Sequence, residues 1–200
     1  DGADYIERMK SQNISTQYVT KLDDMHTAQC MIITDRDNNQ INDFHPGAMT
    51  LAHQNKITAD IKASVGIISP DGRDAMLEHA EQFKAVGIPF VFDPGQAMPM
   101  FNGEELRHFI ELADWVTVND YEGKMLCERT GWTEAEISRK VRGQVVTLGG
   151  EGCEVWENGE KQLIAPVTAK EVVDPTGCGD AWRGALLVGL ERGWTLAQCA

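Results

Sequence analysis

Short apolar runs recur at regular intervals between residues 65 and 148, and this spacing constrains the fold more than any other feature. They start 25, 25 and 30 residues apart, and the segments between them (74–86, 103–113 and 121–131) show helical periodicity with charged faces. A strand, a helix and a second strand within about 30 residues form a βαβ unit. The chain is therefore expected to be α/β, with a mainly parallel sheet. The expected strands are Val65–Ser69, Phe90–Asp93, Trp115–Asn119 and Val145–Leu148.

Polar turns follow each of these expected strands. Residues 70–72, 93–96, 119–122 and 149–152 are rich in carboxylates, amides and glycine. Helix capping and turn chemistry explain any one of them. However, one-handed crossovers bring the carboxyl ends of parallel strands to one edge, where open α/β sheets bind ligands. Four polar turns on one rim therefore favour a binding site there.

The segment from Thr27 to Phe44 has a different pattern, with no helix between its two extended runs. Residues 29–34 and 40–44 are strand-like, and the polar segment 35–39 between them is typical of a β-hairpin turn. We expect this hairpin to lie outside the parallel sheet, as a small β lid. The expected organisation is a core helix and connection over 1–24, the lid hairpin over 25–49 and an α/β nucleotide-binding and catalytic core over 50–200.

Charge and cysteine usage narrow the class of protein. The formal net charge is -13, which disfavours binding to nucleic acid or to an anionic membrane surface. The five cysteines form no CxxC pair, so we expect reduced thiols and a cytoplasmic location. No run of residues is long and apolar enough to predict a membrane helix. The chain begins without Met inside a helical pattern and ends in another, so we expect truncation at both ends.

The segment Asp174–Ala181 carries the sharpest chemical signal. A strand-like stretch leads into it, and a helix of small and apolar residues leads out. Backbone N–H groups of a glycine-rich turn that opens a helix suit a phosphate oxygen, here at Gly177, Cys178 and Gly179. A carboxylate in the first turn, Asp180, can accept a proton from a hydroxyl held beside that anion site. The segment is neither a P-loop nor a dinucleotide-binding fingerprint.

The alternative for Asp180 is a capping residue, with the glycines forming only a tight turn. The pattern Asp-x-Thr-Gly-x-Gly-Asp arises by chance about once in ten thousand chains of this length at average amino-acid usage. This rarity favours the functional interpretation.

The chain resembles the ribokinase-like (phosphofructokinase-B) kinases of sugars and nucleosides. Residues 174–180 resemble the C-terminal signature of that family, 119–122 match its Asn-x-x-Glu motif, and 146–152 are similar to its nucleotide-contacting strand and turn. Residues 44–49 and 92–96 look most like the bacterial adenosine-kinase branch. The resemblance implies a three-layer αβα core with a mainly parallel sheet and a small β lid.

The resemblance also implies roles for individual residues. Asp180 would be the catalytic base, and the backbone at Gly177, Cys178 and Gly179 would hold the transferring phosphoryl group. Asn119 and Glu122 would contact Mg²⁺ through water, and Thr147, Gly149 and Gly152 would contact the nucleotide. Asp174 and Thr176 would hold a monovalent cation such as K⁺. On the lid, Gln29 and Phe44 would contact the substrate. Arg183, one turn after Asp180, is interpreted as a solvent-facing helix arginine rather than a phosphate ligand.

The implied activity is ATP- and Mg²⁺-dependent phosphorylation of a primary hydroxyl, with the 5′-hydroxyl of adenosine as the expected acceptor. The sequence lacks the family's opening strand with its sugar-binding Asp and the Gly-Gly motif that follows it. This absence makes a non-catalytic nucleotide-binding module an alternative. Two others also stay open: a kinase of a free sugar such as ribose or fructose, and a structural domain without ligand. The chain is expected to be a monomer or a homodimer formed through the lid.

Overall fold

The computed structural model describes residues 2–36, 40–171 and 177–200. The chain divides into two compact units. The first unit comprises Asp1–Lys56 with Asp71–Ala75, and the second comprises Ile57–Pro70 with Met76–Ala200. Among the described residues, no helix has the length and apolar character needed to cross a membrane.

The first unit contains a helix, a two-stranded ribbon and a 3₁₀ segment. Strands β1 and β2 pair antiparallel and form a sheet of their own, which confirms the predicted hairpin and its separation from the main sheet. Five large apolar side chains of this ribbon are at least half exposed: Met31, Ile32, Ile33, Ile41 and Phe44. The elements are α1 (Gly2–Ser11), β1 (Gln29–Thr34), β2 (Gln40–His45) and η1 (Gly47–Gln54).

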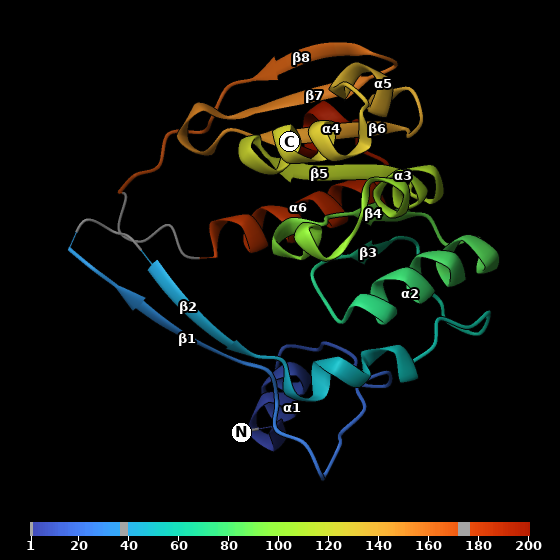
Figure 1. Cartoon of the computed structure of the whole chain (residues 1–200), viewed down its shortest axis with the longest axis vertical. Helices are drawn as coiled ribbons and strands as arrows, with labels where there is room; N and C mark the ends of the chain where they lie inside the picture. Colours follow the sequence, from blue (N-terminus) through green and yellow to red (C-terminus); the bar gives the residue numbers. More distant parts are fainter. Residues whose placement is uncertain (1, 37–39, 172–176) are drawn as a thin grey trace. The chain divides into compact units, whose positions relative to one another are not determined.

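The second unit is built on a six-stranded sheet whose strands lie in chain order (Figure 1). Strands β3 to β6 are parallel, and β7 and β8 continue the sheet antiparallel. The predicted, mainly parallel sheet is thereby confirmed. The strands are β3 (Gly66–Ile68), β4 (Phe90–Phe92), β5 (Trp115–Asn119), β6 (Gly143–Thr147), β7 (Cys153–Glu157) and β8 (Glu160–Ile164).

Helices cover both faces of this sheet, in agreement with the predicted three layers (Figure 1). Because side chains alternate along a strand, Phe90 and Phe92 join one core cluster and Val91 joins the other. The larger cluster packs against α2 to α5, and the smaller one against α6 and α7. The helices are α2 (Arg73–Val86), α3 (Gly103–Leu112), α4 (Asp120–Thr130), α5 (Glu134–Ser138), α6 (Cys178–Glu191) and α7 (Leu196–Cys199), with 3₁₀ segments at Gly95–Met100 and Gly149–Glu151.

The β7–β8 hairpin was not expected from the sequence, although a local signal marks it. Its turn is Asn158-Gly159, with φ of 54° and 85°. A two-residue hairpin loop with positive φ at both positions favours Asn-Gly. The hairpin extends the sheet past β6 with antiparallel strands, which a pattern of βαβ units does not predict.

Candidate active site

The carboxyl ends of the parallel strands bring polar side chains to one edge of the second unit. Asn119 ends β5 and lies opposite Thr147, which ends β6. Ser69 and Asp93 directly follow β3 and β4, and the Ser69 hydroxyl donates a 3.1 Å hydrogen bond to Asp93 Oδ2. The predicted rim of polar residues is therefore present at the ends of these four strands.

Asn119 and Glu122 form a capping box at the start of α4. The Asn119 side chain accepts a hydrogen bond from the backbone N–H of Glu122 at 2.7 Å, and Glu122 Oε2 accepts one from the N–H of Asn119 at 2.8 Å. Both residues therefore cap the helix, which is the structural alternative to binding a ligand. The capping bonds still leave the Asn119 amide nitrogen and Glu122 Oε1 for other contacts.

The turn from Gly149 to Gly152 connects β6 to β7 at the same edge. Gly149 and Gly152 have φ of 58° and 93°, in the region that favours glycine. A Cβ on Gly152 would overlap the carbonyl oxygen of Ile164, so this residue is also required by close packing. Gly149 and its neighbour Gly150 are exposed, with no atom within 4 Å of the place where a Cβ would lie, so their backbone is open to a ligand.

The residues predicted to form the anion site and the base lie at the start of α6. Gly177 is the N-cap with φ of 79°, and its carbonyl accepts the first helical bond from Ala181 at 2.9 Å. The N–H groups of Cys178, Gly179 and Asp180 therefore precede the helical hydrogen-bond ladder, and no side chain among the described residues caps them. Together with the helix dipole, such N–H groups favour an anion. The Asp180 side chain is 88% exposed, within the same turn.

Arg183 is held by a buried carboxylate, so its interpretation as a solvent-facing arginine is wrong. Its Nη2 donates a 3.1 Å hydrogen bond to Asp93 Oδ1, and its Nε contacts Oδ2 of the same carboxylate. Asp93 is only 1% exposed, and the Arg183 side chain 26%. Arg183 Nη1 also lies 3.6 Å from Asp180 Oδ1. No local pattern marks this pair in the sequence, because its members are 90 positions apart.

Burial and charge pairing shift the pKa of Asp93 in opposite directions, and they do the same for Arg183. Burial raises the pKa of Asp93, and this effect outweighs the lowering by Arg183 and by the Ser69 hydrogen bond. For Arg183, burial is the largest single influence and lowers the pKa, but the combined attraction of Asp93, Glu122 and Asp180 leaves it raised. Arg183 therefore stays charged, and it contacts two carboxylates, those of Asp93 and Asp180.

The two predicted substrate contacts lie on the ribbon of the first unit. Gln29 is opposite His45 in the β1–β2 register, and Phe44 is opposite Cys30. Since paired residues share a face and neighbours alternate, Gln29 and Phe44 point to opposite faces of the ribbon. Phe44 is 50% exposed. Asp174 and Thr176, predicted to hold a monovalent cation, lie outside the described residues, as does most of the strand-like stretch before them.

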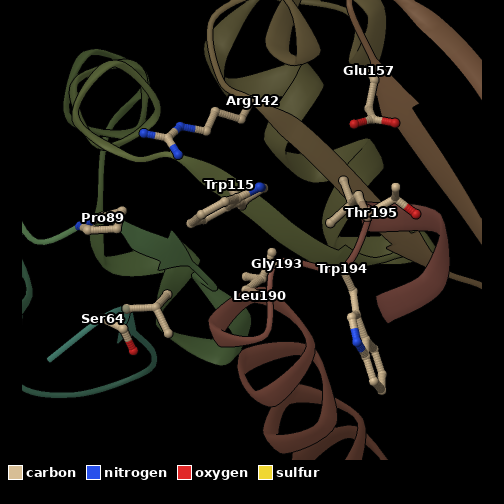
Figure 2. A pocket seen from close by; sticks show the side chains of 11 residues that line it. Ser64, Pro89, Trp115, Arg142, Glu157, Leu190, Gly193, Trp194 and Thr195 are labelled. Atoms are coloured by element: carbon tan, nitrogen blue, oxygen red, sulfur yellow. The ribbon is translucent and has the colours of Figure 1, made fainter.

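A pocket of about 450 Å³ lies at the opposite edge of the sheet, where the parallel strands begin (Figure 2). Trp115 and Leu190 contribute to it, and the Arg142 guanidinium lies 5.3 Å from the centre of the Trp115 ring. Arg142 Nε is already paired with Asp114 Oδ1 at 2.9 Å. None of the predicted site residues lines this pocket, so it is separate from the candidate site.

Comparison with known proteins identifies the family. The model of the pfkB family of carbohydrate kinases matches residues 1–200. The chain belongs to this family. It is 28% identical to a nucleoside kinase of Methanocaldococcus jannaschii, over 98% of this chain and 64% of that protein. A ribokinase of Mus musculus is 26% identical over 92% of this chain and 60% of its own length.

Solved structures of the family agree with the fold. A Burkholderia thailandensis nucleoside kinase in complex with inosine has a TM-score of 0.94 and 45% identity, over 100% of this chain and 65% of that one. The M. jannaschii nucleoside kinase has a TM-score of 0.90 at 26% identity, over 98% of this chain and 64% of that one. An adenosine kinase from Sinorhizobium meliloti, at 23% identity and a TM-score of 0.79, supports the fold alone. The chain thus spans less than two thirds of the length of these relatives.

The donors at the rim fit a magnesium ion that keeps most of its water. Within the described residues, no group of three or more His, Cys, Asp or Glu side chains could hold a metal. Mg²⁺ usually binds through one or two carboxylates, several waters and substrate phosphates rather than through a protein cage. Glu122 Oε1 and the second lone pair of Asn119 Oδ1 are hard oxygen groups that suit such an ion and its water, at the same sheet edge as the turn from Gly149 to Gly152.

Proposed function

We propose that the protein carrying this chain transfers the γ-phosphoryl group of ATP to a primary hydroxyl of a nucleoside, with Mg²⁺ as cofactor. The observation that carries the proposal is the start of α6, where an exposed carboxylate and three N–H groups outside the helical ladder share one turn. Phosphoryl transfer depends on positioning and charge neutralisation more than on covalent chemistry. This turn supplies both an anion site and a proton acceptor.

The mechanism follows from the positions of these groups. Asp180 accepts the proton of the attacking hydroxyl as its oxygen bonds to the γ-phosphorus, and the bond from that phosphorus to the leaving oxygen of ADP breaks. The N–H groups of Cys178 and Gly179, with the helix dipole behind them, offset the charge on the transferring group. Asn119 and Glu122 would hold Mg²⁺ through water, and its charge would further neutralise the phosphates.

Thr147, Gly149 and Gly152 are proposed to lie along the nucleotide, as the family resemblance implies. Gly149 has an exposed and open backbone, which permits the close approach of a ligand. Related kinases support a nucleotide at this fold, since one structure of the B. thailandensis enzyme, 46% identical, is described as a complex with ADP-inosine.

We propose a purine nucleoside as the acceptor, with adenosine first and inosine second. The resemblance of residues 44–49 and 92–96 to adenosine kinases supports adenosine. The inosine complex of the B. thailandensis enzyme, at 45% identity, supports inosine. Similarity to the mouse ribokinase makes a free sugar such as ribose the second candidate class. The five free cysteines further support a reducing, cytoplasmic setting.

The test is ADP release by the complete polypeptide that carries these 200 residues, with ATP and Mg²⁺ and with adenosine, inosine or ribose as acceptor. We expect turnover with a purine nucleoside to exceed that with ribose, and Asp180→Asn to lower kcat by about 10² or more, because general-base catalysis contributes that much. Glu104→Gln is the control, since it removes an exposed carboxylate from the first turn of α3. Higher turnover with ribose would overturn the proposal of a nucleoside substrate, and an unchanged kcat in Asp180→Asn would overturn the proposed mechanism.

A further inference from the structure

We infer that the Asp93–Arg183 pair positions the first turn of α6, and with it the anion site and the proposed base. Arg183 is a positioning residue here: it acts through the backbone of the turn and through Asp180. The inference rests on the proposed function of that turn, and it adds two residues to which neither the motif nor the family comparison gave a role.

The first observation is the geometry of the pair. Asp93 directly follows β4 and is almost fully buried, so its carboxylate belongs to the rigid edge of the sheet. Arg183 Nη2 donates a 3.1 Å hydrogen bond to Oδ1, and Arg183 Nε lies against Oδ2 as an ion contact without a hydrogen bond. One charge-assisted hydrogen bond and one ion contact hold the guanidinium beside this carboxylate. The Ser69 hydroxyl holds Oδ2 from the neighbouring strand end.

The second observation is the contact between the guanidinium and the turn itself. A Cβ on Gly179 would lie 2.7 Å from Arg183 Nη1, so this nitrogen rests directly against the backbone of the first turn. The same Nη1 lies 3.6 Å from Asp180 Oδ1. One guanidinium therefore touches the sheet edge, the backbone of the proposed anion site and the proposed base.

The third observation is that the first turn has no buried side chain of its own. The buried residues of α6 are Leu186 and Gly189, which lie two turns or more beyond its start. Cys178, Gly179 and Asp180 are all exposed. Ends of helices fray unless something holds them, and Arg183 attaches this end to the sheet edge through Asp93, beside Trp182, which packs against the smaller core cluster.

Stability alone is a weak reason for such a pair. Removing two charges from water costs free energy that their attraction does not always recover. Burial outweighs the pairing at Asp93, as the raised pKa of this carboxyl shows. A pair of apolar side chains would attach the helix at least as well, but it would present no positive charge to Asp180 and no guanidinium to Gly179.

The experiment compares Asp93→Asn, Arg183→Gln and Arg183→Lys with Arg192→Gln, a control that removes an arginine from the other end of the same helix. We expect the first two variants to lower kcat roughly tenfold or more while KM for ATP changes little, because misplacement of a transition-state contact acts on kcat. Arg183→Lys keeps the charge without the planar fork, so it should recover part of the loss. A lowered Tm with unchanged kcat would show a structural role only and would overturn the inference.

Hydrogen exchange supplies a readout that needs no substrate and no turnover. In Asp93→Asn, the amides of residues 181–184, the first to be bonded within the helix, should exchange faster than in the wild type, while those of 188–191 keep their protection. If the exchange rates changed by the same factor along the whole of α6 in this variant, the inference would be contradicted. If the wild-type protein phosphorylated no acceptor, the proposed function would fail, and the exchange pattern would still decide whether the pair holds the turn.

Discussion

Substituting alanine for Gly179 tests the contact between the first turn of α6 and Arg183 by a single methyl group. The new Cβ would lie 2.7 Å from Arg183 Nη1, where ordinary contact begins at 3.4 Å. The guanidinium must therefore retreat by about 0.7 Å, the difference between these two distances. A shift of that size is enough to stretch the 3.1 Å bond from Nη2 to Asp93 Oδ1 beyond hydrogen-bonding distance.

Two opposing contributions decide the change in stability. Alanine favours a helix over glycine by up to about 1 kcal/mol. Loss of a hydrogen bond between charged groups costs about 1.5–3 kcal/mol. Gly179→Ala should therefore lower the free energy of unfolding by about 0.5–2 kcal/mol. Gly184→Ala is the matched control on the same helix, because no atom lies within 4 Å of its Cβ position, and it should stabilise by about 0.5–1 kcal/mol.

The assay is urea denaturation of both variants, together with kcat for the acceptor that the wild type prefers. Gly179→Ala should lose activity about tenfold, because the turn that holds the transferring group loses its support. Gly184→Ala should keep wild-type kcat. Equal stability and equal activity of the two variants would refute the reasoning, since it would show that Arg183 moves aside without consequence.

Thiol accessibility and backbone strain give two further predictions. Cys30 and Cys178 are exposed, so a thiol reagent at about pH 8 should modify these two thiols rapidly. Burial raises the pKa of Cys127 to about 12, so that thiol stays protonated and unreactive at this pH. Loss of kinase activity should follow the modification of Cys178, which adds bulk at the anion site, and ATP should slow it. Gly152→Ala should destabilise by about 2 kcal/mol or more, because its φ of 93° and the overlap with the Ile164 carbonyl both oppose a side chain; Gly150→Ala, in open space, should not.

The sheet and its helices were predictable because their signals are local. The expected strand Trp115–Asn119 is observed residue for residue as β5, and the expected helix over 74–86 is α2 with one residue added at its start. Apolar runs and helical periodicity depend only on neighbours in the chain. The β7–β8 hairpin was missed because the βαβ spacing predicts only parallel neighbours, although Asn158-Gly159 is a turn signal as local as the others.

The candidate site was predictable only in part. Asn119, Glu122 and Asp180 were expected at helix starts after strands, and the structure places all three at helix starts. Asn119 and Glu122 each use one hydrogen bond for capping, a use that sequence spacing cannot separate from binding. The role of Arg183 could not be inferred, because its partner Asp93 reaches it only through the fold.

The two glycines of the turn before Asp180 show the same difference between a local requirement and one that depends on the fold. Gly177 adopts φ of 79° with nothing near its Cβ position, so the backbone conformation alone requires glycine there. Gly179 has ordinary helical geometry, and it is the Arg183 guanidinium that leaves no room for a side chain. A motif that resembles a single phosphate-binding loop thus combines a local requirement with a tertiary one. The second requirement couples the loop to the sheet edge, so substitutions at Asp93 and at Gly179 should both lower kcat, because each loosens the first turn of α6.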